Sequence, residues 1–273
     1  MIESPQDHIL VVHLGGLGDV CLSESTFLSL GSHFGGKLIA VGNRRFLDLF
    51  PDYFSSVHSV EAREWLYLFA DGLSGPAWRR IVFIGKDRSA SFRQRLGQFS
   101  REDLLFVDMY PDSPGKHLQE YQLDQLLTLG IEPMEKPMTP KSRDKIILYP
   151  EKGYTKQKWP YEKFLEVYDS LRSQGASVSL LEPFDTEAPH PGSFRFDDLS
   201  DVASFLNRSG LFVSNDCGLA HLAASRGLST ITLFYEADPM IWHPLGDNRS
   251  IRCAPSPSTE ELLALVKDVS RER

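Results

Sequence analysis

The residues that could do chemistry gather first in the segment 211–227, LFVSNDCGLAHLAASRG. Its first three residues are apolar and suit a short buried parallel strand. We expect Asp216 to be the N-cap of a following helix, and Gly218 to let a ligand approach the first backbone N–H groups of that helix. Such a helix start, at the carboxyl end of a strand, offers free N–H groups and a partial positive charge. This segment therefore predicts a phosphate site.

Two more side chains of this segment, Cys217 and His221, are four residues apart and would share one face of the helix. We expect Cys217 to be a small reduced residue, although a helix start also lowers the pKa of a thiol and can make it reactive. For His221 the alternatives are a packed helical histidine and a contact with the bound phosphates.

A second turn, GGLGDV, follows the apolar run 9–14 near the N-terminus. The glycines allow a tight turn, so we expect a substrate to lie against the backbone of Gly16, Leu17 and Gly18. The spacing is not the dinucleotide fingerprint GxGxxG, so nicotinamide binding is not supported. Asp19 would stand at the start of the first helix, where its simplest role is to cap that helix.

Cationic side chains follow two further expected strands of the first half. They are Arg44 and Arg45, then Lys86 and Arg88. A pair of arginines can bind a carboxylate or phosphate through bidentate hydrogen bonds. The alternative is a set of solvated surface cations.

In the second half, the loop after the strand 145–150 contains Thr155, Lys156 and Lys158 just before a helix that opens near Pro160. This cluster suits a phosphate group, and its alternative is a solvated lysine loop. The loop after the next strand contains Glu182 and Glu187, which suit ribose hydroxyls or a base; carboxylates on a loop are otherwise simply solvated. We expect no metal site there.

Strands and helices alternate along the chain, which predicts an α/β fold. The best domain boundary is the segment 131–144, since its prolines forbid regular structure. We therefore expect an N-terminal domain over residues 1–140 and a C-terminal domain over residues 145–273. A capping box formed by Ser258 and Glu261 opens a last amphipathic helix, 258–271.

Bulk properties exclude several classes of function. A net charge of −8 argues against nucleic-acid binding by charge. The three cysteines are far apart, which indicates neither a zinc site nor a disulfide framework. No apolar run approaches the ~18 residues of a membrane helix, and the acidic N-terminus is unlike a secretory signal. We expect a cytoplasmic monomer; peripheral contact with the inner face of the cytoplasmic membrane stays open.

Three islands, GLGDV, KWPYEKF and NDCGLAHLAA, resemble glycosyltransferase family 9, the heptosyltransferases of bacterial lipopolysaccharide synthesis. The resemblance implies a GT-B fold, with two Rossmann-like domains facing across a cleft. It also implies an inverting, metal-independent enzyme without a cofactor. Its donor would be an ADP-sugar or another nucleotide-diphospho-sugar, with heptose as the default. Its acceptor would be a hydroxyl of a glycan or lipid-linked molecule such as lipopolysaccharide core. In such folds the last helix often returns to the N-terminal domain.

The resemblance also suggests residue roles. Asp19 matches the proposed general base, which takes a proton from the acceptor hydroxyl, and residues 16–18 with the four cations would hold the acceptor. The donor would lie against Asp216, Cys217, Gly218 and His221. The family's diphosphate-binding lysine falls at Gln157 here, so Lys156 or Lys158 would replace it. A glutamate near 182–187 would bind the nucleotide.

The chain departs from the family pattern at His13, usually arginine, and at Gln157 and Glu236. These departures keep a second hypothesis open, a catalytically altered nucleotide-sugar-binding protein on the same fold. A third, a dinucleotide-dependent enzyme, is disfavoured because the chain lacks the GxGxxG fingerprint.

Overall fold

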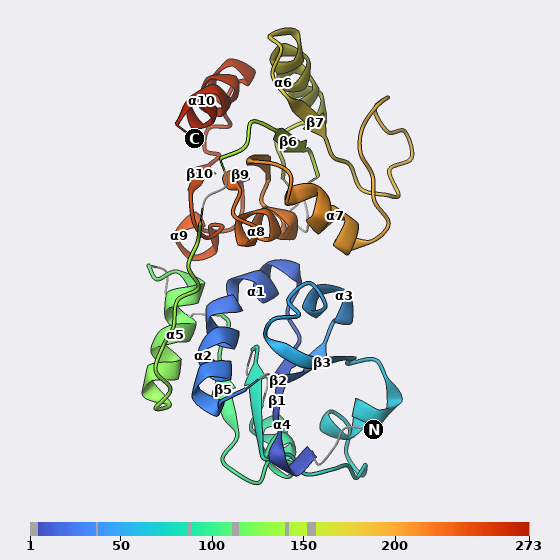
Figure 1. Cartoon of the computed structure of the whole chain (residues 1–273), viewed down its shortest axis with the longest axis vertical. Helices are drawn as coiled ribbons and strands as arrows, with labels where there is room; N and C mark the ends of the chain where they lie inside the picture. Colours follow the sequence, from blue (N-terminus) through green and yellow to red (C-terminus); the bar gives the residue numbers. More distant parts are fainter. Residues whose placement is uncertain are drawn as a thin grey trace. The chain divides into compact units, whose positions relative to one another are not determined.

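The computed structural model describes residues 5–36, 38–86, 89–110, 115–139, 142–151 and 157–272. The chain divides into two compact units, Met1–Lys136 and Pro137–Arg273 (Figure 1). The division falls inside the proline-bearing segment 131–144. Each unit contains its own parallel five-stranded sheet with helices, so the expected α/β fold with two Rossmann-like domains is confirmed.

Unit 1 has the strand order β3-β2-β1-β4-β5, and every pairing is parallel. Its strands are β1 (Ile9–His13), β2 (Leu38–Gly42), β3 (Phe54–Ser59), β4 (Arg80–Ile84) and β5 (Leu105–Val107). Its helices are α1 (Leu17–Leu22), α2 (Glu24–Phe34), α3 (Arg44–Leu47), α4 (Ala90–Gly97) and α5 (Leu118–Thr128), with 3₁₀ turns at Pro5–Asp7 and Arg63–Leu68. Successive strands are added on one side of β1 up to β3 and on the other side from β4 onward, so the strand order reverses between β1 and β4. In such a sheet, ligands bind outside the carboxyl ends of the strands at this switch point.

The core of unit 1 explains why an unbroken apolar run forms β1. All five residues of the strand are buried, as expected for a central parallel strand covered on both faces. Leu10 and Val12 pack on one face of the sheet with Phe83 of β4 and with Trp65 and Trp78. This packing fixes the end of β1, and therefore the start of the turn that carries Asp19.

Unit 2 has the order β10-β9-β8-β6-β7, again parallel throughout. Its strands are β6 (Ile146–Tyr149), β7 (Val178–Leu180), β8 (Leu211–Asn215), β9 (Ser229–Phe234) and β10 (Asn248–Arg252). Its helices are α6 (Tyr161–Ser173), α7 (Leu199–Leu206), α8 (Gly218–Ser225), α9 (Pro239–Trp242) and α10 (Thr259–Arg271). Here the switch point lies between β6 and β8, so the segments after these two strands are the expected ligand positions.

The last helix packs within unit 2, where α10 lies beside α6 (Figure 1). A return of this helix to the N-terminal domain stays a prediction. Leu262, Val266 and Val269 enter the same core as Trp159 and Phe164. Amphipathicity predicts that a helix buries one face, but it does not identify the surface that this face covers.

Helices in the described part of the chain are short, and α6 and α10 have 13 residues each. A bilayer crossing needs about 20 mostly apolar residues. None of the described helices combines the length and the apolar composition of a membrane span.

Candidate functional site

In unit 1, the carboxylate of Asp19 lies at the switch point beyond β1. Asp19 is the third residue of α1, and the N-cap residue Gly16 donates its backbone N–H to Asp19 Oδ2 at 2.8 Å. Among the described residues, Oδ1 receives no hydrogen bond. Burial raises the pKa of Asp19, and the Gly16 hydrogen bond opposes this rise. Capping and proton acceptance are therefore compatible, because one oxygen holds the helix start and the other is available to a substrate.

The turn before Asp19 is so tight that its glycines are not equivalent. A Cβ at Gly15 would lie 2.5 Å from Asp19 Cβ and 2.8 Å from Met109 Cε, whereas a Cβ at Gly16 would lie 3.7 Å from Asp19 Oδ2. Gly15 thus lets the side chains of Asp19 and Met109 pack against the turn. The expected approach of a substrate to Gly16 stays a prediction. Leu17 and Gly18 form the first turn of α1 with Asp19 and are half-buried. Their contact with a substrate stays a prediction.

The cations of unit 1 fall into different environments. Arg44 opens α3 and pairs with Asp48 at 2.9 Å, and Arg45 is exposed beside it. Lys86 is exposed two residues after β4, the strand that borders the same switch point as Asp19. Arg88 lies outside the described residues. By topology, Lys86 is therefore the better candidate for binding an acceptor near Asp19. Arg44 is the weaker candidate because its charge is already paired with Asp48.

In unit 2, Asp216 lies directly beyond β8 but does not cap α8, which corrects the expectation. The N-cap is Cys217, and its side chain makes no capping hydrogen bond. Asp216 donates its backbone N–H to the Leu233 carbonyl at 3.0 Å, so it still continues the pairing of β8 with β9. Burial raises the pKa of Asp216 to about 6, and its carboxylate has no hydrogen-bond partner among the described residues. The side chain is therefore available to a ligand.

The start of α8 brings together the other residues of this segment. Burial raises the pKa of the Cys217 thiol to about 11, so Cys217 is a protonated packing residue at neutral pH rather than a reactive thiolate. Gly218 is the first residue of α8, and His221 is buried one turn further. A phosphate role for Gly218 and His221 stays a prediction.

Asn215 is a functional candidate that the sequence analysis missed. This last residue of β8 is 1% exposed; its Oδ1 accepts the Trp159 backbone N–H at 2.7 Å, and its Nδ2 donates to the Pro150 carbonyl at 3.3 Å. Asn215 therefore fastens β8 to both sides of the lysine-containing segment 151–158. The sequence signal that could have identified Asn215 is its polar amide next to Asp216, at the end of an apolar strand.

The lysine-containing segment is only partly described. Thr155 and Lys156 lie outside the described residues, whereas Lys158 is exposed just before Trp159. Gln157 donates its backbone N–H to a Glu236 carboxylate oxygen at 3.2 Å. Two of the departures from the family pattern, Gln157 and Glu236, are therefore in contact with each other.

The buried Glu182 carboxylate connects two segments of unit 2 through hydrogen bonds. It is 3% exposed, and its two oxygens accept the Tyr161 hydroxyl at 2.8 Å and the His190 backbone N–H at 2.9 Å. These bonds hold the loop after β7 against the start of α6. Glu187 is exposed on the same loop. Nucleotide binding by Glu182 or Glu187 stays a prediction.

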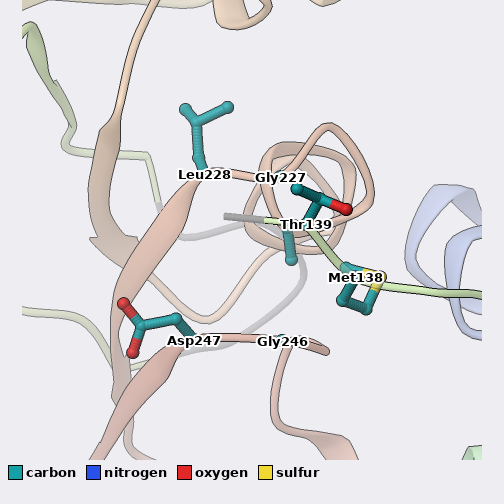
Figure 2. Close-up of a pocket in the computed structure, with 7 residues that line it drawn as sticks. Met138, Thr139, Gly227, Leu228, Gly246 and Asp247 are labelled. Carbon is teal, nitrogen blue, oxygen red and sulfur yellow. The ribbon is translucent and has the colours of Figure 1, made fainter. Parts of the chain in front are cut away.

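A small notch in unit 2 is not a ligand site. Its lining includes Met138, Gly227, Gly246 and Asp247, and its empty volume is about 190 Å³ (Figure 2). Gly227 and Asp247 precede β9 and β10, so the notch lies at the amino ends of these strands, away from the switch point. Met138 of the interdomain segment forms one wall and packs on Gly246, where an added Cβ would lie 3.3 Å from Met138 Cε.

Comparison with known proteins places this geometry in context. The model of glycosyltransferase family 9 (heptosyltransferase) matches residues 197–264, which include β8 and α8. This match confirms the resemblance seen in the NDCGLAHLAA island. Among curated protein sequences, no significant match was found.

Solved structures match over nearly the whole chain. A glycosyl transferase family 9 protein of Veillonella parvula has a TM-score of 0.72 at 14% identity, covering 98% of both chains. The E. coli heptosyltransferase WaaC, solved with ADP, has a TM-score of 0.66 at 17% identity, covering 97% of this chain and 99% of its own. The E. coli ADP-heptose lps heptosyltransferase II has a TM-score of 0.70 at 14% identity, with the same coverage. The chain therefore shares the fold of the heptosyltransferases.

Proposed function

We propose that this protein is a glycosyltransferase that moves a sugar from a nucleotide-diphospho-sugar to a hydroxyl of a glycan or lipid-linked acceptor. The observation that carries the proposal is the Asp19 carboxylate, held through one oxygen at the switch point beyond β1 with its other oxygen available. The family match over residues 197–264 and the shared fold support the class of reaction.

In this reaction Asp19 acts as the general base. A sugar hydroxyl is a weak nucleophile, and a positioned carboxylate that takes its proton contributes ~10²–10⁴-fold to the rate. The raised pKa of Asp19 makes it a stronger base than an exposed aspartate. The activated oxygen attacks the anomeric carbon as the bond to the diphosphate breaks. Such a single displacement inverts the anomeric configuration.

The donor binds unit 2. Backbone N–H groups at the start of α8 face the diphosphate and stabilise the charge that grows on it as it leaves. Lys158 and Lys156 add positive charge from the neighbouring segment. The Asp216 carboxylate accepts hydrogen bonds from sugar hydroxyls, which would compensate for its burial. Because charge stabilisation comes from protein groups, the proposed reaction uses neither a metal ion nor a cofactor.

Heptose is our first choice of donor sugar, with ADP as the nucleotide, because the E. coli WaaC structure contains ADP. Lipopolysaccharide core is the corresponding acceptor. We place the enzyme in the cytoplasm, acting as a monomer, with acceptors at the inner face of the membrane.

A thermal-shift panel of nucleotide-sugars tests the donor class. A donor at ~100 times its Kd stabilises the protein by about 2.7 kcal/mol, which a melting curve resolves. We expect a rise in Tm with ADP-sugars that is reduced in Asp216→Asn. Binding without transfer or hydrolysis would favour the catalytically altered binding protein, and no shift with any nucleotide-sugar would contradict the proposal.

A further inference from the structure

A chain of hydrogen bonds connects the end of β1 to the backbone of Asp19. Gly15 donates its backbone N–H to His13 Nδ1 at 3.3 Å, and His13 Nε2 lies 3.2 Å from Ser23 Oγ. The Ser23 hydroxyl in turn donates to the Asp19 carbonyl at 2.8 Å. His13 therefore contacts the turn before Asp19 directly and the helix after it through Ser23.

The directions of these bonds identify the tautomer of His13. Nδ1 accepts from Gly15, so it carries no proton, and Nε2 is then the protonated nitrogen of the neutral ring. Nε2–H donates to Ser23 Oγ, which leaves the Ser23 proton for the Asp19 carbonyl. A second proton on Nδ1 would face the Gly15 N–H, so only the neutral ring satisfies the whole chain.

The surroundings of His13 keep the ring in this form. The side chain is fully buried and meets Phe27 edge-on, with ring centroids 5.8 Å apart. Burial lowers the pKa of His13 to about 4. Ser23 is also fully buried. Because both side chains are shielded from water, their polar atoms depend on these partners within the protein.

We propose that His13 and Ser23 are positioning residues for Asp19, holding the two backbone segments on either side of its carboxylate. The inference rests on the proposed function, in which Asp19 is the general base. Gly15 packs against the Asp19 side chain, and the Asp19 carbonyl belongs to the same residue as the carboxylate. Fixing both therefore limits where the carboxylate points, and a misplacement of ~1 Å is enough to cost about 100-fold in rate.

Two variants break the chain at different links. Ser23→Ala removes the hydroxyl that joins His13 to the Asp19 carbonyl, while Ser23→Thr keeps a hydroxyl there. His13→Gln retains an N–H donor toward Ser23 but has no acceptor atom at the position of Nδ1, which accepts from Gly15. The matched control is Ser209→Ala, because Ser209 is also fully buried and donates to a carbonyl four residues earlier, that of Phe205.

The kinetic test is a double-mutant cycle with Asp19→Asn. We expect Ser23→Ala to lower kcat by about 10–100-fold with a change of less than about 3-fold in donor KM. Ser23→Thr should recover most of this loss, and Ser209→Ala should match wild type. In the Asp19→Asn background, Ser23→Ala should cost nothing further. An equal loss in both backgrounds would overturn the positioning role.

A second readout needs no activity. The carboxyl carbon of Asp19, followed by NMR against pH, reports how well Gly16 holds Oδ2. We expect a higher Asp19 pKa in Ser23→Ala and His13→Gln, because a loosened Gly16 hydrogen bond lowers it less. Should His13→Gln fail to fold, Ser23→Ala decides. An unchanged Asp19 pKa overturns the inference even if transfer is observed, whereas full transfer by Asp19→Asn overturns only the proposed function.

Discussion

Asn215 Oδ1 accepts the backbone N–H of Trp159 at 2.7 Å, and this bond joins the end of β8 to the residues that open α6. Trp159 is fully buried, and its indole N–H donates to the Pro257 carbonyl at 3.0 Å. Trp159 lies beyond the sheet, so its backbone N–H has no partner on a neighbouring strand. The side-chain amide of Asn215 provides the acceptor instead. It also sets the position from which the lysine-containing segment 151–158 departs.

Removing this amide should affect both stability and donor binding. Asn215→Ala leaves the buried Trp159 N–H without an acceptor, which costs about 1–3 kcal/mol. We also expect weaker donor binding, since Lys158 adjoins Trp159. Urea unfolding and titration with an ADP-sugar measure the two effects. The control is Asn248→Ala, because Asn248 is only half-buried and its hydrogen bond to the Gly246 carbonyl is exposed; equal losses in the two variants would argue against the role of Asn215.

Asp216 should make the protein less stable when it ionises. Its pKa in the folded protein is about 6, above the ordinary value of 3.8. Between these values the folded state binds more protons than the unfolded state, so this contribution is present below about pH 4 and is lost as the pH rises through 6. Asp216→Asn should therefore be more stable than wild type by about 1–3 kcal/mol at pH 7.5. At pH 4 the two should be nearly equal.

Urea unfolding of wild type and Asp216→Asn at pH 4 and pH 7.5 tests whether ionised Asp216 lowers the free energy of unfolding. The same variant should bind the donor more weakly, which would show that the residue costs stability in exchange for binding. If wild type is as stable as Asp216→Asn at pH 7.5, burial of the ionised Asp216 carboxylate does not destabilise the folded protein.

These sites show which features of the structure can be predicted from the sequence. Central strands such as β1 and β8 follow from continuous apolar runs, and the topology then places the polar residues after them at switch points. Strand β3 was not anticipated because FSSVHS is polar and mostly half-exposed at the edge of its sheet. Contacts between distant residues, such as Asn215 with Trp159 and Ser23 with His13, depend on packing that no local pattern encodes. The cap of α8 was assigned one residue early because pairing with β9 extends to Asp216.

The tight turn before Asp19 should tolerate no side chain at one position. Gly15→Ala places a methyl group 2.5 Å from Asp19 Cβ, so the backbone must shift, at a cost of about 1–3 kcal/mol. Because the shift moves Asp19, activity should fall as well. Gly16 has φ −71°, which any residue adopts, so Gly16→Ala should cost less than about 1 kcal/mol. Thermal unfolding of the two variants tests this difference, and equal costs would contradict the crowding at Gly15.

At the end of unit 1, the half-buried Lys136 forms an ion pair with the buried Glu24. Lys136 Nζ lies 2.6 and 2.7 Å from the two carboxylate oxygens of Glu24, which is 3% exposed. Lys136→Met leaves that carboxylate buried without its cation, and we expect a loss of about 2–4 kcal/mol. Lys116→Met breaks an exposed pair with Asp124 and should have a much smaller effect on stability. Chemical unfolding compares them, and a small effect for Lys136→Met would mean that Glu24 is stabilised by its other contacts.

The central claim is that Asp19 accepts a proton from the acceptor hydroxyl. The most direct measurement is the rate of sugar transfer from an ADP-sugar by wild type and Asp19→Asn, with donor affinity measured on the same samples. We predict that Asp19→Asn lowers kcat by ~10²–10⁴-fold while binding the donor as wild type does. In wild type, kcat should fall as the pH drops through the raised pKa of Asp19, because the protonated carboxyl cannot act as a base. Transfer by Asp19→Asn at the wild-type rate would contradict the account.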